Sequence, residues 1–185
     1  TYVELYDSFG SYTVNGDLTA DYAPSYGVDQ IYQHTFTNVP NIANEWPTDS
    51  EYAFSTLCST AYTIFAPTNA AIEDFFERFW KPGGYNSLAE VDKVALSNFI
   101  YNYVYAGNML FPADLQATGD DAPISGAGTR LNIDPYSVAE ERRIMCVNGA
   151  LYGLDHIDTP SSFSSVVGSI FQNKSSISFL YALAG

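Results

Sequence analysis

The pattern of hydrophobic and polar positions in the middle of the chain predicts a strand followed directly by a helix. Residues 62–66 form a short apolar run that ends at Pro67, because proline has no amide hydrogen to donate to a sheet. Thr68 is placed to cap a helix over 70–80. Apolar positions three and four residues apart give that helix one stripe, made of Ile72, Phe75, Phe76, Phe79 and Trp80. The Lys-Pro-Gly-Gly sequence at 81–84 predicts its end.

A second helix and a hairpin are predicted further along. Ser87 and Glu90 have the spacing of a capping box, and apolar positions continue a helix over 88–105 until Gly107. Residues 108–133 are loop-like, with short strands possible around Ile124 and Leu131. Segments 144–147 and 150–157 predict a hairpin around Asn148-Gly149. The tail, 163–185, is apolar and helix-prone, and one face would carry Ile177, Leu180, Tyr181 and Ala184.

The first fifty residues have no sustained helical period. Two stretches, 11–14 and 31–36, alternate like short strands, and the second would carry Tyr32, His34 and Phe36 on one face. Between them, residues 15–27 are rich in turn-forming residues and predict an exposed loop. Residues 38–49 predict an irregular connection.

The net charge of the chain limits the kinds of molecule that it is expected to bind. The 185 residues include 21 Asp and Glu against seven Lys and Arg, a formal net charge of −14. This surface repels phosphate backbones, so nucleic acid is excluded as a partner, and anionic membranes are disfavoured for the same reason. No run approaches the roughly 20 apolar residues that span a bilayer, so direct membrane insertion is not expected.

The residue types that commonly act in catalysis form no recognisable reaction centre in the sequence. Cys58 and Cys146 form no Cys-x-x-Cys motif and are either bridged or two separate buried thiols. His34 and His156 are far apart in sequence, and His156 is expected on a solvent-facing strand position. Nucleotide-binding, Gly-x-Ser-x-Gly and EF-hand spacings are missing, so we expect no enzyme, cofactor or metal.

The aromatic content offers a candidate ligand surface. Exposed tyrosine and tryptophan rings stack on sugar faces or pack against proteins, and four candidates lie in the head of the chain: Tyr22, Tyr26, Tyr32 and Trp46. The alternative is that half of these rings close the core beneath long loops.

Three patterns, taken in order, resemble the fasciclin-like domain, a secreted adhesion module that often occurs in tandem. The sequence TIFAPTNAAI opens one helix, FIYNYVYAG ends another, and VNGALYGLDHID precedes a proline. The residues that carry the match are structural candidates: Thr63, Phe65, Ala66, Pro67, Thr68, Asn69, Asn148 and Gly149. Their polar groups are expected to cap the helix and to bond to buried backbone near the Asn148 turn.

The resemblance implies an α+β fold, a β-sheet wedge flanked by helices. It also implies a non-catalytic cell-adhesion module at the cell surface, anchored through its parent chain, that binds a protein or a polysaccharide. The alternative is a structural spacer in a tandem surface protein that contacts mainly sibling domains. One departure matters: Asn102-Tyr103 stands where some members carry a Tyr-His pair used in receptor recognition, so that recognition is not carried over.

The resemblance also divides the chain. Residues 1–160 would form the fasciclin-like domain, with a divergent N-terminal segment. Residues 161–185 resemble the helical opening of such a domain, which predicts a tandem fragment or a permuted domain. The tail would then pack on its own head or on a neighbouring molecule, making tail-mediated self-association possible.

Overall fold

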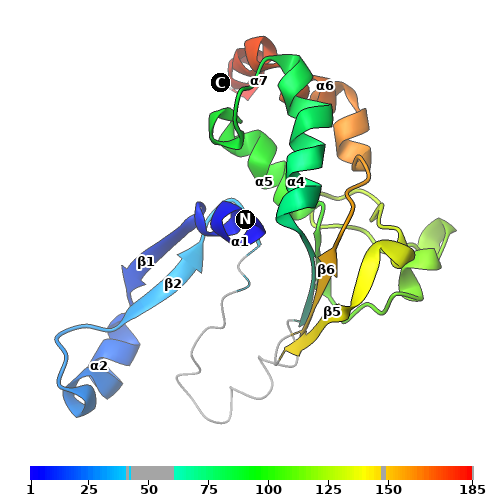
Figure 1. Ribbon diagram of the computed structural model, residues 1–185. Helices are drawn as coiled ribbons and strands as arrows, with labels where there is room; N and C mark the ends of the chain where they lie inside the picture. Colours follow the sequence, from blue (N-terminus) through cyan, green and yellow to red (C-terminus); the bar gives the residue numbers. More distant parts are fainter. Residues whose placement is uncertain (41, 43–60, 147–148, 185) are drawn as a thin grey trace.

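A four-stranded sheet lies at the centre of the computed structural model, which describes residues 1–40, 42, 61–146 and 149–184. Its strand order is β4-β3-β6-β5. Strands β3 and β6 pair in parallel, and the two outer pairs are antiparallel. The strand bounds are β3 Ala61–Pro67, β4 Val104–Gly107, β5 Val138–Cys146 and β6 Gly149–Leu154. Helices gather at one end of this sheet (Figure 1), so the fold is α+β, as the sequence predicts.

The predicted junction between strand and helix is present. Strand β3 ends at Pro67, and the Thr68 hydroxyl accepts the Ala71 backbone N–H at 3.3 Å as the N-cap of α4, Asn69–Phe75. A π-helical turn over Phe76–Trp80 and a 3₁₀ turn over Lys81–Gly83 continue the helix. Gly84, with φ of 96°, then ends it in the left-handed region. The apolar stripe faces the core, except that Phe76 is only partly buried.

The second predicted helix is wrong at both ends. Helix α5 spans Lys93–Tyr101, is capped by Asp92, and follows a separate 3₁₀ turn over Leu88–Glu90. Glu90 accepts the backbone N–H of Asn86, so the expected Ser87 capping box does not form. Residues 104–107 form strand β4 instead of the last helical turn. Valine and tyrosine suit a strand, and pairing with β3 outweighs the helical period.

An arm made of the N-terminal segment projects from the body (Figure 1). Helix α1, Tyr2–Asp7, packs on the core and leads into an antiparallel ribbon of β1, Gly10–Val14, and β2, Tyr32–Phe36. Helix α2, Gly16–Tyr26, joins the two strands where the sequence predicts a loop. That prediction is wrong because Asn15 and Gly27, typical turn residues, are the two caps of this helix.

The predicted hairpin is formed by β5 and β6, with Cys146 opposite Gly149. Its turn residues, 147 and 148, lie outside the described residues. Strand β6 ends at Leu154, earlier than expected, and the register of β5 shifts between Val138 and Arg143. In the loop before β5, Ile124 and Arg130 form a single antiparallel bridge, in place of the short strands expected around Ile124 and Leu131.

The tail folds into short helices that lie against the body. A 3₁₀ turn over Ser161–Ser164 precedes α6, Val166–Gln172, and a 3₁₀ turn over Lys174–Ser176 precedes α7, Ile177–Ala184. Ile177 and Leu180 pack against the core, as predicted. Tyr181 is exposed instead, and its hydroxyl donates to the Asp92 carboxylate at 2.8 Å.

Aromatic rings at the helical end of the sheet form the centre of the core. Phe163 is 3% exposed, and its ring centroid lies 5.1 to 6.3 Å from those of five other rings: Phe75, Phe79, Trp80, Phe99 and Phe171. Because Phe163 lies in the 3₁₀ turn at the start of the tail, this cluster fixes the tail to the helices. No helix among the described residues is long and apolar enough to cross a bilayer.

A buried polar network joins three segments at Asn102, the residue that ends α5. Its amide nitrogen donates to the Asn98 carbonyl and to Ser162 Oγ, and its amide oxygen accepts from Thr129 Oγ1 at 3.1 Å. Ser162 Oγ donates in turn to Asn98 Oδ1. Asn102 is thus the centre of an internal hydrogen-bond network.

Replacing Gly149 should destabilise the sheet. A Cβ at this position would lie 1.8 Å from the Tyr62 carbonyl oxygen, since β6 crosses β3 at close range there. We expect Gly149→Ala to lower the free energy of unfolding by about 3 kcal/mol in urea titration. Gly16→Ala, where nothing lies within 4 Å, is the matched control and should be neutral or slightly stabilising. Equal effects of the two substitutions would contradict the close approach.

Removing the amide of Asn102 should leave buried partners unpaired. We expect Asn102→Leu to lower the free energy of unfolding by about 2 kcal/mol, because Ser162 and Thr129 each lose a hydrogen bond. Asn132→Ala, which removes an exposed bond to the Thr159 carbonyl, should cost less than about 1 kcal/mol. A loss at position 102 no larger than at position 132 would show that the network is not stabilising.

Docking of the tail should weaken in acid. The Lys174 ammonium, together with the Asn86 backbone amide, lowers the pKa of Glu90 to about 2. A carboxylate with a depressed pKa stabilises the folded state above its unfolded pKa, and that contribution is lost as the pH falls toward the folded value. The protection factors of α7 amides, which are exchange rates corrected for the intrinsic pH dependence of exchange, should therefore fall between about pH 4.3 and pH 2. Glu90→Gln should remove this pH dependence, and a profile unchanged by that substitution would refute the assignment.

Candidate interaction surfaces

The motif residues on β3 point into the protein and hold neighbouring segments. Thr63 is fully buried, and its hydroxyl accepts the Leu110 N–H at 2.9 Å and donates to the Asn108 carbonyl at 3.2 Å. Phe65, also fully buried, stacks on Tyr152 with 5.6 Å between ring centroids. These residues hold the segment after β4 against the sheet.

The end of the motif is tied to the end of β6. Pro67 is buried opposite Leu154, and the Thr68 backbone N–H donates to the Leu154 carbonyl at 2.8 Å. Ala66 is half-buried opposite Gly153. We expected the polar groups at the Pro67–Asn69 junction to bond to backbone near the Asn148 turn. That expectation is wrong, because the parallel register places Gly149 beside Tyr62, at the opposite end of β3. Asn148 itself lies outside the described residues.

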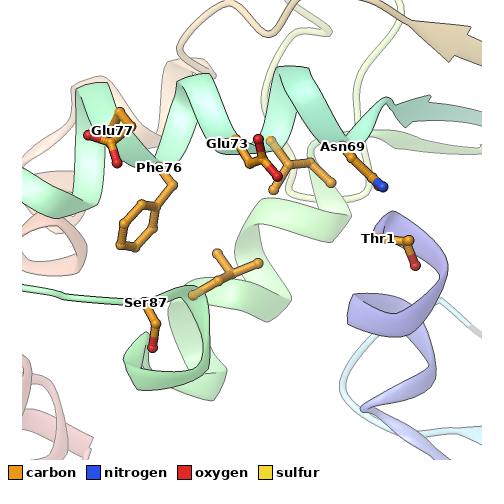
Figure 2. A pocket seen from close by; sticks show the side chains of 8 residues that line it. Thr1, Asn69, Glu73, Phe76, Glu77 and Ser87 are labelled. Atoms are coloured by element: carbon orange, nitrogen blue, oxygen red, sulfur yellow. The ribbon is translucent and has the colours of Figure 1, made fainter.

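Asn69, the last motif residue, lies at the rim of an open groove (Figure 2). The groove encloses about 450 Å³ between α4, the turn that begins at Leu88, and the start of α1. Its lining consists of Thr1, Asn69, Ile72, Glu73, Phe76, Glu77, Ser87 and Leu88. Sequence reasoning missed it because Phe76 was assigned to the core stripe.

The chemistry of the groove favours an apolar or cationic side chain. Phe76, Ile72 and Leu88 supply apolar surface, and Glu73 adds a carboxylate that pairs with no basic side chain in the described part of the chain. Glu77 is already engaged by Lys81 at 2.6 Å. Among the described residues that line the groove there is no histidine, cysteine or lysine. The apolar side chains and the Glu73 carboxylate give the groove the character of a binding surface.

The ribbon of the arm has one aromatic face and one polar face. Because side chains alternate along a strand, the cross-strand pairs Tyr12–His34 and Val14–Tyr32 share one side. The Tyr12 and His34 rings stack 4.5 Å apart, and His34 lies 4.5 Å from Phe36, which reaches the core through Tyr6. Tyr12 is 71% exposed and Tyr32 is 57% exposed. We call this set the aromatic ribbon face: Tyr12, Val14, Tyr32, His34 and Phe36.

Two further candidates extend the exposed aromatic surface of the arm. Tyr22 and Tyr26 lie four residues apart on α2, and both are exposed, Tyr26 by 72%. These two and Tyr32 do not close the core, contrary to the alternative that such rings lie beneath loops. Trp46 lies outside the described residues.

Sequence reasoning missed Tyr12, the most exposed ring of the ribbon face. It predicted strands at 11–14 and 31–36 but gave no reason to pair them, because the connection is too long for a hairpin turn. Pairing depends on helix α2, whose Asn15 cap side chain donates to Gln33 Oε1 at 2.9 Å. The signal that was available is that the two alternating stretches flank a segment with helix-capping residues at both ends, Asn15 and Gly27.

Groups capable of catalysis or metal binding remain scattered. His34 lies 3.4 Å from Asp7 on the arm, and His156 lies 3.3 Å from Asp158 after β6. Cys146 is an exposed free thiol, so the prediction of a buried one is wrong, and Cys58 lies outside the described residues. Among the described residues, no three His, Cys, Asp or Glu side chains are grouped to hold a metal ion.

Comparison with known proteins places the sheet and its motif in a family. A model of the Fasciclin domain matches residues 44–163, a range that contains both motif segments and the whole four-stranded sheet. Searches of the curated proteins and of the solved structures each returned no match. Domains of this family are generally cell-adhesion and interaction modules, typically extracellular or at the cell surface. The match covers well over half of the sequence, so this chain belongs to the fasciclin domain family.

Proposed function

We propose that this chain is a non-catalytic adhesion module that binds a protein or polysaccharide partner through its arm. The observation that carries the proposal is the set of exposed tyrosines on a ribbon and helix that project from the body (Figure 1). Ring side chains provide large contact areas at low cost in conformational entropy, which is why binding surfaces are rich in tyrosine. An extracellular position, with anchoring through the parent chain, is part of the same proposal.

Separation of motif and arm supports this assignment. Thr63, Phe65 and Pro67 of the family motif are buried and fix the sheet, so they offer little surface to a partner. The arm is joined to the body through Tyr6, Phe36 and the Lys93 ammonium, which donates to the Ser8 carbonyl at 2.7 Å. Substitutions at its outer tyrosines can therefore change binding while the sheet stays intact.

Loss of arm tyrosines should weaken partner binding without unfolding the protein. We expect Tyr26→Ala and Tyr32→Ala each to raise the dissociation constant about tenfold, equivalent to about 1.4 kcal/mol, for ligands found on glycan and surface-protein arrays. Tyr136→Ala is the matched control, since Tyr136 is 89% exposed but follows the loop before β5. Its affinity should equal that of the wild type. Equal binding by all three variants would refute the role of the arm.

A further inference from the structure

Every basic side chain of this protein already has a partner other than Glu73, the carboxylate that lines the groove beside Asn69. The sequence contains seven Lys and Arg residues, and all seven lie in the described part of the chain. Four of them pair with other carboxylates: Arg78, Lys81, Arg142 and Lys174. The remaining three donate to backbone carbonyls: Lys93, Arg130 and Arg143. A cation that pairs with Glu73 would therefore have to come from another molecule.

The helical segment that carries Glu73 contains an occupied site of the same kind. The Arg78 guanidinium donates to Asp74 Oδ2 at 2.8 Å, and its Cζ lies 5.8 Å from the centroid of the Phe75 ring. The same guanidinium donates to the Ile157 carbonyl at 2.8 Å. A planar, weakly hydrated guanidinium suits this combination, because it can bond to a carboxylate and contact an aromatic ring together. One carboxylate and one phenyl ring thus hold an arginine here.

The groove offers a second carboxylate and phenyl ring. Glu73 and Phe76 are three residues apart along the helical segment, so their side chains are neighbours on its surface. Both line the groove, and Figure 2 shows Phe76 pointing from the helix toward the turn that carries Ser87. A guanidinium in the groove can therefore contact this ring and this carboxylate at the same time.

The rest of the groove suits the alkyl stem of such a side chain. Ile72 is buried and Leu88 is half-buried, and both supply apolar lining. The volume of about 450 Å³ lies within the range of binding pockets. A π-helical turn begins at Phe76, which stays half-buried while Phe79 and Trp80 enter the core. Turns of this type are rare and frequently occur at functional sites.

The charge of the molecule selects the kind of partner. With a net charge of −14, the chain repels a second copy of itself, and the basic residues of that copy would already be engaged. A protein with a basic surface is attracted instead. Because the groove is open, it can receive a side chain that projects from such a surface.

We propose that the groove beside Asn69 binds an arginine side chain of a different, basic protein. Glu73 pairs with the guanidinium, Phe76 packs against its plane, and Ile72 and Leu88 contact its stem. This site lies on the body, apart from the tyrosines of the arm, so the inference goes beyond the proposed function.

Titration of the isotope-labelled full chain with the blocked peptide acetyl-Gly-Leu-Arg-Leu-Gly-amide, followed by NMR, tests the proposal. Backbone amide signals of residues 72–77 and 87–88 should shift. The dissociation constant should lie between about 0.1 and about 1 mM, because one side chain supplies few contacts. A peptide with citrulline in place of arginine keeps the shape and loses the charge, and it should bind at least about tenfold more weakly.

Substitutions in the groove should weaken binding of the arginine peptide. We expect Glu73→Gln and Phe76→Leu each to raise the dissociation constant about fivefold, since each removes one of the two contacts to the guanidinium. Phe76→Leu keeps an apolar side chain at this half-buried position. Glu141→Gln, at an exposed position of β5, makes the same change in net charge as Glu73→Gln and should bind like the wild type. Circular dichroism and urea titration of each variant separate lost contact from lost fold.

Three results would overturn the proposal. One is the absence of shifts in the groove amides at about 5 mM peptide, a concentration well above the expected dissociation constant. Another is equal weakening by Glu73→Gln and Glu141→Gln, which would indicate attraction by net charge alone. The third is equal binding of the citrulline peptide, which would indicate an apolar occupant.

The proposed function of the arm is judged separately. Tyr26→Ala should leave the dissociation constant of the arginine peptide unchanged, because Tyr26 lies on α2. If the groove binds no arginine while Tyr26→Ala weakens binding of arrayed ligands, only the inference about the groove is refuted. If the arginine peptide binds in the groove while the arm variants bind arrayed ligands like the wild type, only the role of the arm is refuted.

Discussion

The parallel pairing of β3 with β6 is the constraint on which the rest of the structure depends. It joins the two motif segments, which lie about eighty residues apart, and it aligns the ends of both strands so that each leads to the same helical layer. Parallel strands need a long crossover, and here α4, α5, β4 and β5 lie within it. The close approach at Gly149 and the Thr68 bond to Leu154 fix the register at its two ends.

Buried polar side chains form hydrogen bonds to the backbone of the segments that leave the sheet. The Thr63 hydroxyl donates to the Asn108 carbonyl and accepts the Leu110 N–H. The Tyr152 hydroxyl donates to the Leu110 carbonyl at 2.8 Å. Asn102 performs the same role between α5 and the start of the tail. Buried polar side chains of this kind are expensive unless paired, so they specify one arrangement of the loops. The buried residues of the family motif therefore have a structural role.

The division between a rigid body and an exposed arm suits an adhesion module. The body provides a core of packed rings, whereas the arm presents exposed tyrosines on a two-stranded ribbon. The net charge of −14 limits nonspecific contacts between copies of the chain, because like charges repel. A groove beside Asn69 adds a second, smaller surface with acidic and apolar character.

The sequence by itself determined the elements whose signals are local. Pro67 and Thr68 set the junction, the Phe and Trp stripe predicted the buried face of α4, and alternation in 31–36 predicted the ribbon face. Only the tertiary structure decided that Val104–Gly107 pairs as a strand, that Asn15 and Gly27 cap a helix, and that Tyr12 stacks on His34. Propensity is a weak preference at such positions, and contacts between distant segments supply the larger free energy. The exposed aromatic face followed from that pairing.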